Sequence, residues 1–170
     1  MLEDQIIIER YNKNWPDKFA EEAAKLSIVL SQYIQGSIEH VGSTAVPGLS
    51  AKPIIDIMVG IQSLEHAKPT IEMLKQYGYC YYPYKPEVMH WFCKPTPEIR
   101  THHLHLIPHL SPLWQERIRF REALKADSEL ANDYQNLKYQ LATQFAKDRE
   151  TYTARKWPFI KKAIKKSLIK

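Results

Sequence analysis

Long hydrophobic runs are missing from this chain of 170 residues. No apolar stretch approaches the roughly 18 residues that a membrane-spanning helix needs, so no transmembrane segment is predicted. The first residues are acidic and include only a very short apolar stretch, unlike a secretory signal. We therefore expect a cytoplasmic protein that does not enter a membrane.

Cysteine is also scarce. The two cysteines, Cys80 and Cys93, match neither a disulfide framework nor a zinc-binding pattern. They are spaced to face each other across a hairpin centred near residues 86–87, so a bridge between them is geometrically conceivable. Because the cytoplasm keeps such thiols reduced, we expect both to be free.

Repeats, low-complexity segments and linkers are absent as well. A chain of this length suits one domain that buries about two-thirds of its unfolded surface. We expect one domain over residues 1–170, in which residues 1–110 form an α/β core and residues 111–170 form a helical segment. The sequence says nothing about the oligomeric state.

Acidic residues are missing from the C-terminal end. Seven Lys and Arg residues and no Asp or Glu occur from residue 155 onward, and without these seven the net charge of +5 would become −2. An apolar stripe of Ile160, Ile164 and Leu168 predicts an amphipathic helix with a basic outer face. The lysines of that face are Lys161, Lys162, Lys165 and Lys166. Such a face can bind RNA electrostatically, or it can simply be solvated.

Local patterns predict a mixture of strands and helices. The expected strands cover residues 5–9, 37–41, 54–61, 79–84, 88–93 and 100–107, with the fourth and fifth forming a hairpin or strand pair. The first expected helix begins near Pro16 and ends before Gly36. Further helices are expected over residues 63–77, 112–125, 128–147 and 151–168. Pro158 is expected to kink or restart the last of them. This order indicates an α+β fold.

Residues 37–61 carry the most informative pattern. They comprise a short strand, a loop rich in small residues, Pro and Gly, and a second strand whose single charged residue is Asp56. Such an apolar strand is typically buried on both faces. An ionised Asp56 must therefore be hydrogen-bonded, paired or metal-bound. The alternative is an Asp that caps the neighbouring loop.

The pattern of Gly-Ser followed about a dozen residues later by Asp resembles the nucleotidyltransferase superfamily of the DNA polymerase β type. The longer string HVGSTAVPGLSAKPIIDI at residues 40–57 closely resembles the GrpB family, also called UPF0157. The likeness continues through RTHHLH at residues 100–105 and YTxxK at residues 152–156, so it covers nearly the whole chain. It implies a nucleotidyltransferase-like mixed β-sheet core flanked by helices, with a helical C-terminal third.

The same resemblance implies that Gly42 and Ser43 hold the triphosphate of a nucleotide. Glycine allows the backbone to approach closely, and convergent N–H groups suit an anion. Ser43 and Thr44 add hydroxyl groups, and Lys52 adds a charge that suits phosphate. Capping of a helix is the alternative role for Ser43 and Thr44.

By this resemblance Asp56 binds magnesium. The superfamily usually has a second carboxylate two residues later, where this chain has Met58, a poor ligand for a hard cation. This departure indicates a single-metal site, a different metal, or a protein that binds nucleotide without transferring it.

His103 and His105 point to one face of their strand and His102 to the other. If that strand lies beside the Asp56 strand, a two-His-one-carboxylate set favours manganese, iron, nickel or zinc. Structural hydrogen bonds are the alternative role for these histidines.

Four further residues are candidates for the same pocket. His40 precedes the Gly-Ser motif, and Glu39 is its alternative on the opposite face of the strand. Tyr152 and Lys156 lie four residues apart and share one helical face. The resemblance implies that this face closes over the site, with Lys156 at a phosphate and Tyr152 at a base or ribose. The alternative is a solvated lysine and a core tyrosine.

Together these patterns predict binding of a nucleoside triphosphate, ATP in the first instance, with magnesium or manganese. Transfer of a nucleotidyl group to an unknown acceptor would follow, with Asp56, His103 and His105 as the catalytic residues. One alternative is a catalytically silent protein that binds a nucleotide or anion. Another is a metal-dependent phosphoester hydrolase that uses the His and Asp side chains.

Overall fold

The computed structural model describes residues 5–168. Its strands are β1 (Ile34–Val41), β2 (Ile55–Ile61), β3 (Cys80–Tyr82), β4 (His90–Pro95) and β5 (Arg100–Pro108). Its α-helices are α1 (Trp15–Val29), α2 (Leu64–Ala67), α3 (Thr70–Lys75), α4 (Pro112–Ala126), α5 (Ser128–Gln144) and α6 (Arg149–Ser167). A short 3₁₀ helix, η1 (Ser43–Ala45), follows β1. The α+β fold with a mixed sheet core and a helical C-terminal third is confirmed.

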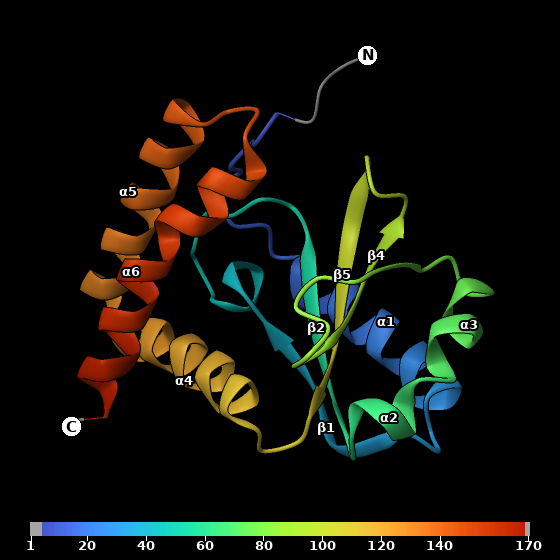
Figure 1. Cartoon of the computed structure of the whole chain (residues 1–170). Coiled ribbons are helices and arrows are strands. Elements are labelled where there is room, and N and C mark those ends of the chain that lie inside the picture. Colours follow the sequence, from blue (N-terminus) through green and yellow to red (C-terminus); the bar gives the residue numbers. More distant parts are fainter. Residues whose placement is uncertain (1–4, 169–170) are drawn as a thin grey trace.

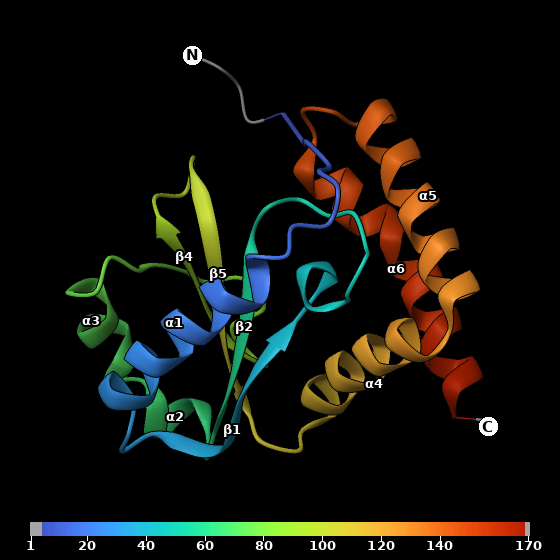
Figure 2. The same cartoon turned by 180° about the vertical axis from the view of Figure 1, so that it is seen from behind.

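The sheet forms the middle of three layers (Figure 1). Helices α1, α2 and α3 cover one face, and α4, α5 and α6 lie on the other side (Figures 1 and 2). The strand order is β1-β2-β5-β4-β3. Strand β2 pairs antiparallel with β1 and parallel with β5, while β4 pairs antiparallel with both β5 and β3. This order brings β2 and β5 together at the centre of the sheet.

The face toward α1 is a continuous apolar core. Ile55, Ile57 and Val59 of β2 are almost completely buried and belong to one cluster with Trp15 and Leu26 of α1. Each such side chain contributes about 1.5–3 kcal/mol when it is removed from water. This side of β2 therefore anchors the strand that carries Asp56.

The opposite face is only partly covered by α4. Val41, Met58, Ile107 and Trp114 form a second buried cluster there. Helices α5 and α6 pack against α4 and build a separate cluster around Tyr134. The three helices begin where the sequence offers side-chain caps, which are Ser111, Asp127 and Asp148.

Two predictions about elements are wrong. Residues 5–9 form no strand, and a single bridge joins Glu9 to Ala51. The helix predicted over residues 63–77 is divided into α2 and α3, because Pro69 lacks the N–H group that would continue α2. Helix α6 continues through Pro158 without a restart, and a kink there stays a prediction.

The hairpin prediction is confirmed, with Cys80 directly opposite Cys93 on β3 and β4. Both thiols are free. Among the described residues, no helix combines the length and hydrophobicity needed to cross a membrane.

Candidate functional site

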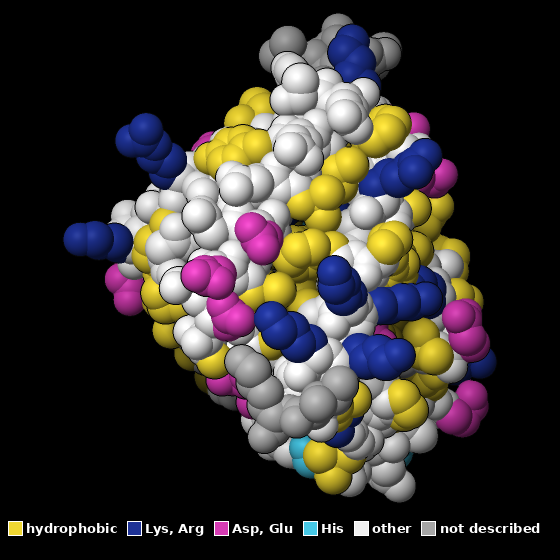
Figure 3. Space-filling model, turned by 90° about the vertical axis from the view of Figure 1, so that its left-hand side faces the viewer, with side chains coloured by type: hydrophobic (Ala, Val, Ile, Leu, Met, Phe, Trp, Pro, Cys, Tyr) yellow, Lys and Arg dark blue, Asp and Glu magenta, His cyan; other side chains and the backbone are white. Residues whose placement is uncertain are grey.

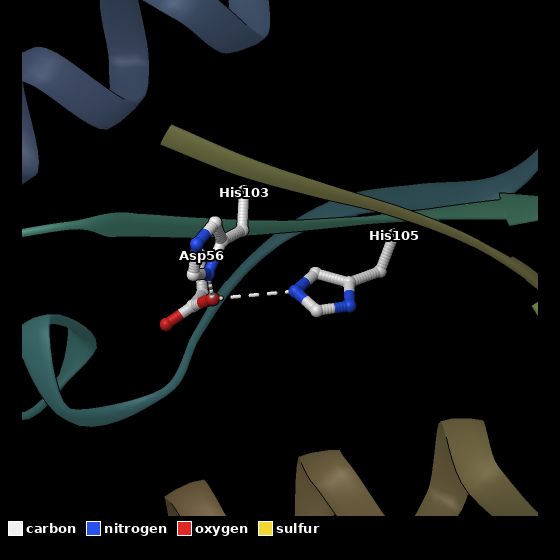
Figure 4. A group of neighbouring side chains, drawn as sticks. All are labelled: Asp56, His103 and His105. Atoms are coloured by element: carbon white, nitrogen blue, oxygen red, sulfur yellow. Dashed lines mark hydrogen bonds and ion pairs between the residues drawn. The ribbon is translucent and has the colours of Figure 1, made fainter. Parts of the chain in front are cut away.

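Asp56 lies between two histidine rings on the sheet face that points toward α4. The register pairs Asp56 with His103, and Met58 with His105, so all four side chains share this face. The Oδ1 atom of Asp56 lies 3.1 Å from His103 Nδ1 and 3.2 Å from His105 Nε2 (Figure 4). The second carboxylate oxygen points away from both rings (Figure 4). The predicted grouping of these three residues is thus observed.

The three side chains are arranged to keep Asp56 ionised and His105 neutral. Burial by itself would raise the pKa of Asp56, but hydrogen bonds from His103 and His105 outweigh it and hold the pKa well below its usual range. Burial, together with the nearby charge of Arg117, lowers the pKa of His105 to about 4. A carboxylate beside a neutral imidazole is the protonation state that metal binding requires.

The donor atoms of Asp56, His103 and His105 all lie within 4.8 Å of one another. Two imidazoles and one carboxylate suit manganese, iron, nickel or zinc better than magnesium. The ring nitrogens that face away from Asp56, His103 Nε2 and His105 Nδ1, are buried and have no hydrogen-bond partner among the described residues. The fit to a divalent cation rests instead on the Asp56 carboxylate and the two ring nitrogens that face it, His103 Nδ1 and His105 Nε2.

Met58 lies two residues after Asp56 on the same face of β2. It is fully buried and packs with Val41 and Trp114 in the cluster under α4. This apolar packing excludes a hydrated cation at that position. The groups beside the Asp56 carboxylate come instead from the neighbouring strand β5, as the imidazoles of His103 and His105.

The other candidates near the strands have structural partners. Glu39 pairs with Arg121 of α4 at 2.7 Å. His40 lies on the α1 face, where its ring stacks on Phe19 with centroids 4.7 Å apart. His102 also lies on the α1 face, as its alternation with His103 predicted. The structure thus separates His40 from the face that carries Asp56.

The Gly-Ser loop passes directly over Asp56. Gly42 has a φ of +74°, and a Cβ atom added there would lie 2.6 Å from Asp56 Oδ2. Glycine is required here both for the backbone conformation and for the close approach. Ser43 begins η1 without capping it, and its hydroxyl hydrogen-bonds Tyr134. The hydroxyl of buried Thr44 lies 2.9 Å from His40 Nε2 and donates to the Ile54 carbonyl at 3.4 Å.

Lys52 and Lys156 meet at the ring of Tyr152, which is fully buried. The Nζ atoms of Lys52 and Lys156 lie 5.1 and 4.5 Å from the ring centroid. Burial, and then repulsion from Lys52, lowers the pKa of Lys156 to about 7, while Asp56 acts in the opposite direction. The structure therefore brings together the lysines predicted from the loop and from the C-terminal helix.

Lys138 is a residue that the sequence reasoning missed. It lies on α5 with its side chain buried, and its Nζ atom donates to the Ser50 carbonyl and sits 5.0 Å from the Tyr134 ring centroid. Burial, then repulsion from Lys156 and Lys52, lowers its pKa to about 7. We call Lys52, Lys138 and Lys156 the lysine cluster. The available signal was the helical spacing of Lys138 with buried Tyr134 and Leu141.

The predicted basic outer face of α6 is also present. Lys161, Lys162, Lys165 and Lys166 are exposed, while Ala163 between them is buried. Figure 3 shows Lys and Arg side chains close together on this side of the molecule. Binding of RNA at this face stays a prediction.

Comparison with known proteins establishes the family. The family model described as GrpB protein matches residues 5–166. The chain is 33% identical over 161 residues to glutamate-rich protein GrpB of Alkalihalophilus pseudofirmus, covering 92% of each chain. The crystal structure of conserved protein GrpB from Enterococcus faecalis has a TM-score of 0.85, 32% sequence identity, and coverage of 95% of this chain and 97% of that one. The chain belongs to the GrpB family.

A distant likeness exists to the Cid1 poly(U) polymerase. Its TM-score is 0.45 with 14% identity, over 76% of this chain and 44% of that one. A likeness of this size supports no inference about function.

Proposed function

We propose that this GrpB-family protein binds a nucleoside triphosphate together with a divalent metal and transfers the nucleotidyl group to an acceptor. ATP is the first nucleotide to test. The proposal combines the Gly42-Ser43 motif with two features that lie beside it, the Asp56 metal-ligand group and the lysine cluster.

The lysine cluster is the observation that carries the proposal. The contacts of Lys138 and Lys156 in the described structure are to a backbone carbonyl and to aromatic rings, none of which is negatively charged. Ammonium groups gathered in a desolvated place are unfavourable, which is why the pKa values of Lys138 and Lys156 are lowered. A polyanion would relieve both the repulsion and the desolvation. A triphosphate has the required charge, and Asp56 lies close enough to influence Lys156.

The residues of the chain divide the work between the triphosphate and the metal ion. The lysine cluster and the backbone at Gly42 would hold the triphosphate, while Asp56, His103 and His105 would hold the cation. A cation bound there would neutralise phosphate charge and align the groups for in-line attack. The acceptor oxygen forms a bond to the α-phosphorus as the bond to pyrophosphate breaks, and the proton of the acceptor passes to solvent.

Isothermal titration calorimetry with ATP tests the binding part of the proposal. The titrations compare no metal, magnesium and manganese for the wild type, Asp56→Asn and the control Asp133→Asn, which changes an exposed carboxylate on α5. We expect metal-dependent binding that Asp56→Asn weakens and Asp133→Asn leaves intact. Absence of ATP binding with either metal would overturn the proposal.

A metal-dependent phosphoester hydrolase is the second candidate, because two imidazoles favour a transition metal over magnesium. The products distinguish the two candidates. Transfer releases pyrophosphate and requires an acceptor, whereas hydrolysis of a phosphoester proceeds with water and without ATP.

A further inference from the structure

An aromatic surface adjoins the metal-ligand group on the edge of the sheet. Tyr82 of β3 lies opposite Trp91 of β4, and Trp91 lies opposite His105 of β5, so these side chains share the sheet face of Asp56. The ring centroids of Trp91 and His103 are 4.9 Å apart. The aromatic surface thus begins in direct contact with the metal-ligand group.

Two tyrosine rings extend this surface into solvent. Tyr82 and Tyr84 each meet Trp91 edge-on, with centroids 6.2 and 6.3 Å apart. Their exposed fractions are 60% and 40%, while Trp91 beneath them is 7% exposed. We call Tyr82, Tyr84 and Trp91 the aromatic platform. Exposed rings that rest on a buried ring are held in place and ready to stack with a ligand.

Two cations adjoin the aromatic platform. Lys85 Nζ lies 5.6 Å from the Tyr84 ring centroid and 5.1 Å from that of Trp157 on α6. Arg100 lies over the Trp91 ring at 5.4 Å. The Lys85 contact with Trp157 links the loop after β3 to the same helix that carries Lys156. The platform therefore combines stacking surfaces with cations at short range.

The strand order places the platform and the Gly-Ser loop on opposite sides of the metal-ligand group. The loop follows β1, the group stands on β2 and β5, and the platform stands on β4 and β3. A nucleotide held by the loop and the lysine cluster would therefore meet an acceptor that arrives from the platform. This step depends on the proposed function, which supplies the nucleotide.

We propose that the aromatic platform binds the end of a single-stranded nucleic acid and that this strand is the acceptor. Alternating aromatic rings and cations suit unpaired bases and the phosphates between them. A duplex keeps its bases stacked on one another, so it cannot present them to Tyr82 and Tyr84. A free nucleoside could stack but would leave Lys85 and Arg100 without a phosphate.

Fluorescence anisotropy of a fluorescein-labelled single-stranded RNA decamer tests the platform on the full chain without ATP or metal. The double variant Tyr82→Ser with Tyr84→Ser removes both exposed rings. Its matched control is Tyr77→Ser with Tyr139→Ser, which changes two tyrosines of similar exposure, 51% and 40%, one just after α3 and one on α5, neither of them part of the platform. Neither pair alters charge, so electrostatic binding at the basic face of α6 is the same in both. Thermal unfolding verifies that each variant is folded.

We expect the platform variant to weaken RNA binding by at least about tenfold, since stacking contributes roughly 1–3 kcal/mol per base. The control variant and a Tyr82→Phe with Tyr84→Phe variant, which keeps the rings, should bind like the wild type. Equal weakening in platform and control variants would overturn the proposal. So would undetectable binding, equal affinity for a duplex of the same sequence, or displacement of the RNA by an equimolar free nucleoside.

The two proposals fail separately in these experiments. The Tyr82→Ser with Tyr84→Ser variant should weaken RNA binding and leave ATP binding intact, because neither tyrosine belongs to the lysine cluster or to the metal-ligand group. RNA binding without ATP binding would keep the platform and overturn the nucleotidyl-transfer role. ATP binding without RNA binding would keep the nucleotide site and overturn the platform proposal.

Discussion

The two charged parts of the candidate site are stabilised in opposite ways. Asp56, His103 and His105 stand on adjacent strands and hydrogen-bond to one another, so the negative charge is compensated within the group. The lysine cluster is contributed by a loop and two helices, and burial acts against its positive charge. The charge of the first part is compensated in the free protein, whereas burial disfavours the charged forms of Lys138 and Lys156 in the second. This difference predicts that mutations in the two parts will have different consequences.

The largest effect is expected from removing the charge of the strand-based part. Asp56→Asn should lower the affinity for manganese by about 100-fold or more, since even groups that only orient metal ligands change affinity by 10- to 100-fold. Calorimetry with manganese alone measures this change. His103→Ala should also lower the affinity, and Asp133→Asn should not. Unchanged manganese affinity in Asp56→Asn would show that this carboxylate is not a ligand.

A smaller effect on binding is expected from a substitution in the lysine cluster. This substitution should weaken ATP binding without lowering the stability of the free protein. Lys156→Met should weaken ATP binding by roughly 10- to 100-fold, because a hydrogen bond to a charged group contributes about 1.5–3 kcal/mol. The free protein should be at least as stable as the wild type, since the variant removes a desolvated charge beside Lys52 and Lys138. Calorimetry and thermal unfolding measure the two effects. Lys161→Met, on the exposed face of α6, is the control for both.

A loss of both stability and ATP affinity in Lys156→Met would contradict the view that the cluster is unfavourable in the free protein. Loss of affinity in Lys161→Met to the same degree would mean that the ATP phosphates respond to charge anywhere on α6.

Proton uptake should distinguish the two parts, at up to about two protons per ATP, one for Lys138 and one for Lys156. At pH 8 a lysine with a pKa of about 7 is mostly neutral, and a nearby triphosphate favours its charged form and raises its pKa. Binding should therefore take protons from the buffer. In calorimetry with several buffers, the observed binding enthalpy should rise with the ionisation enthalpy of the buffer. The slope of this dependence should be smaller for Lys156→Met than for the wild type. A slope of zero in the wild type would contradict a neutral lysine in the free protein.

The strand-based part was the more predictable of the two. Alternation along a strand fixes which residues share a face, so it correctly grouped His103 with His105 and set His102 apart. That β5 pairs with β2 is a long-range property, since 47 residues separate Asp56 from His103. For the same reason the sequence left His40 and Glu39 as alternatives, and the register between β1 and β2 places Glu39, not His40, on the Asp56 face.

The helix-based part was less predictable. A lysine in a helix is usually solvated, and the burial of Lys138 results from the packing of α5 against the segment that contains Ser50. Lys52 and Lys156 were found through the motifs that resemble the family, and Lys138 lies outside those motifs. Secondary structure failed where one residue interrupted a helical pattern, as Pro69 does between α2 and α3. Such breaks depend on backbone hydrogen bonds, and the spacing of apolar residues does not show where these bonds are lost.

The smallest predicted effect concerns the loop that lies beside both parts. Gly42→Ala places a Cβ atom 2.6 Å from Asp56 Oδ2, whereas Gly48→Ala, also at positive φ, meets nothing within 4 Å. Both variants should lose stability because a side chain is strained at positive φ, by about 1–3 kcal/mol each. Gly42→Ala should lose roughly 1 kcal/mol more from the contact and should also weaken manganese binding, since Asp56 must move. Urea unfolding and manganese calorimetry measure the two differences. Equal stability and equal manganese affinity in the two variants would mean that the Gly-Ser loop does not position Asp56.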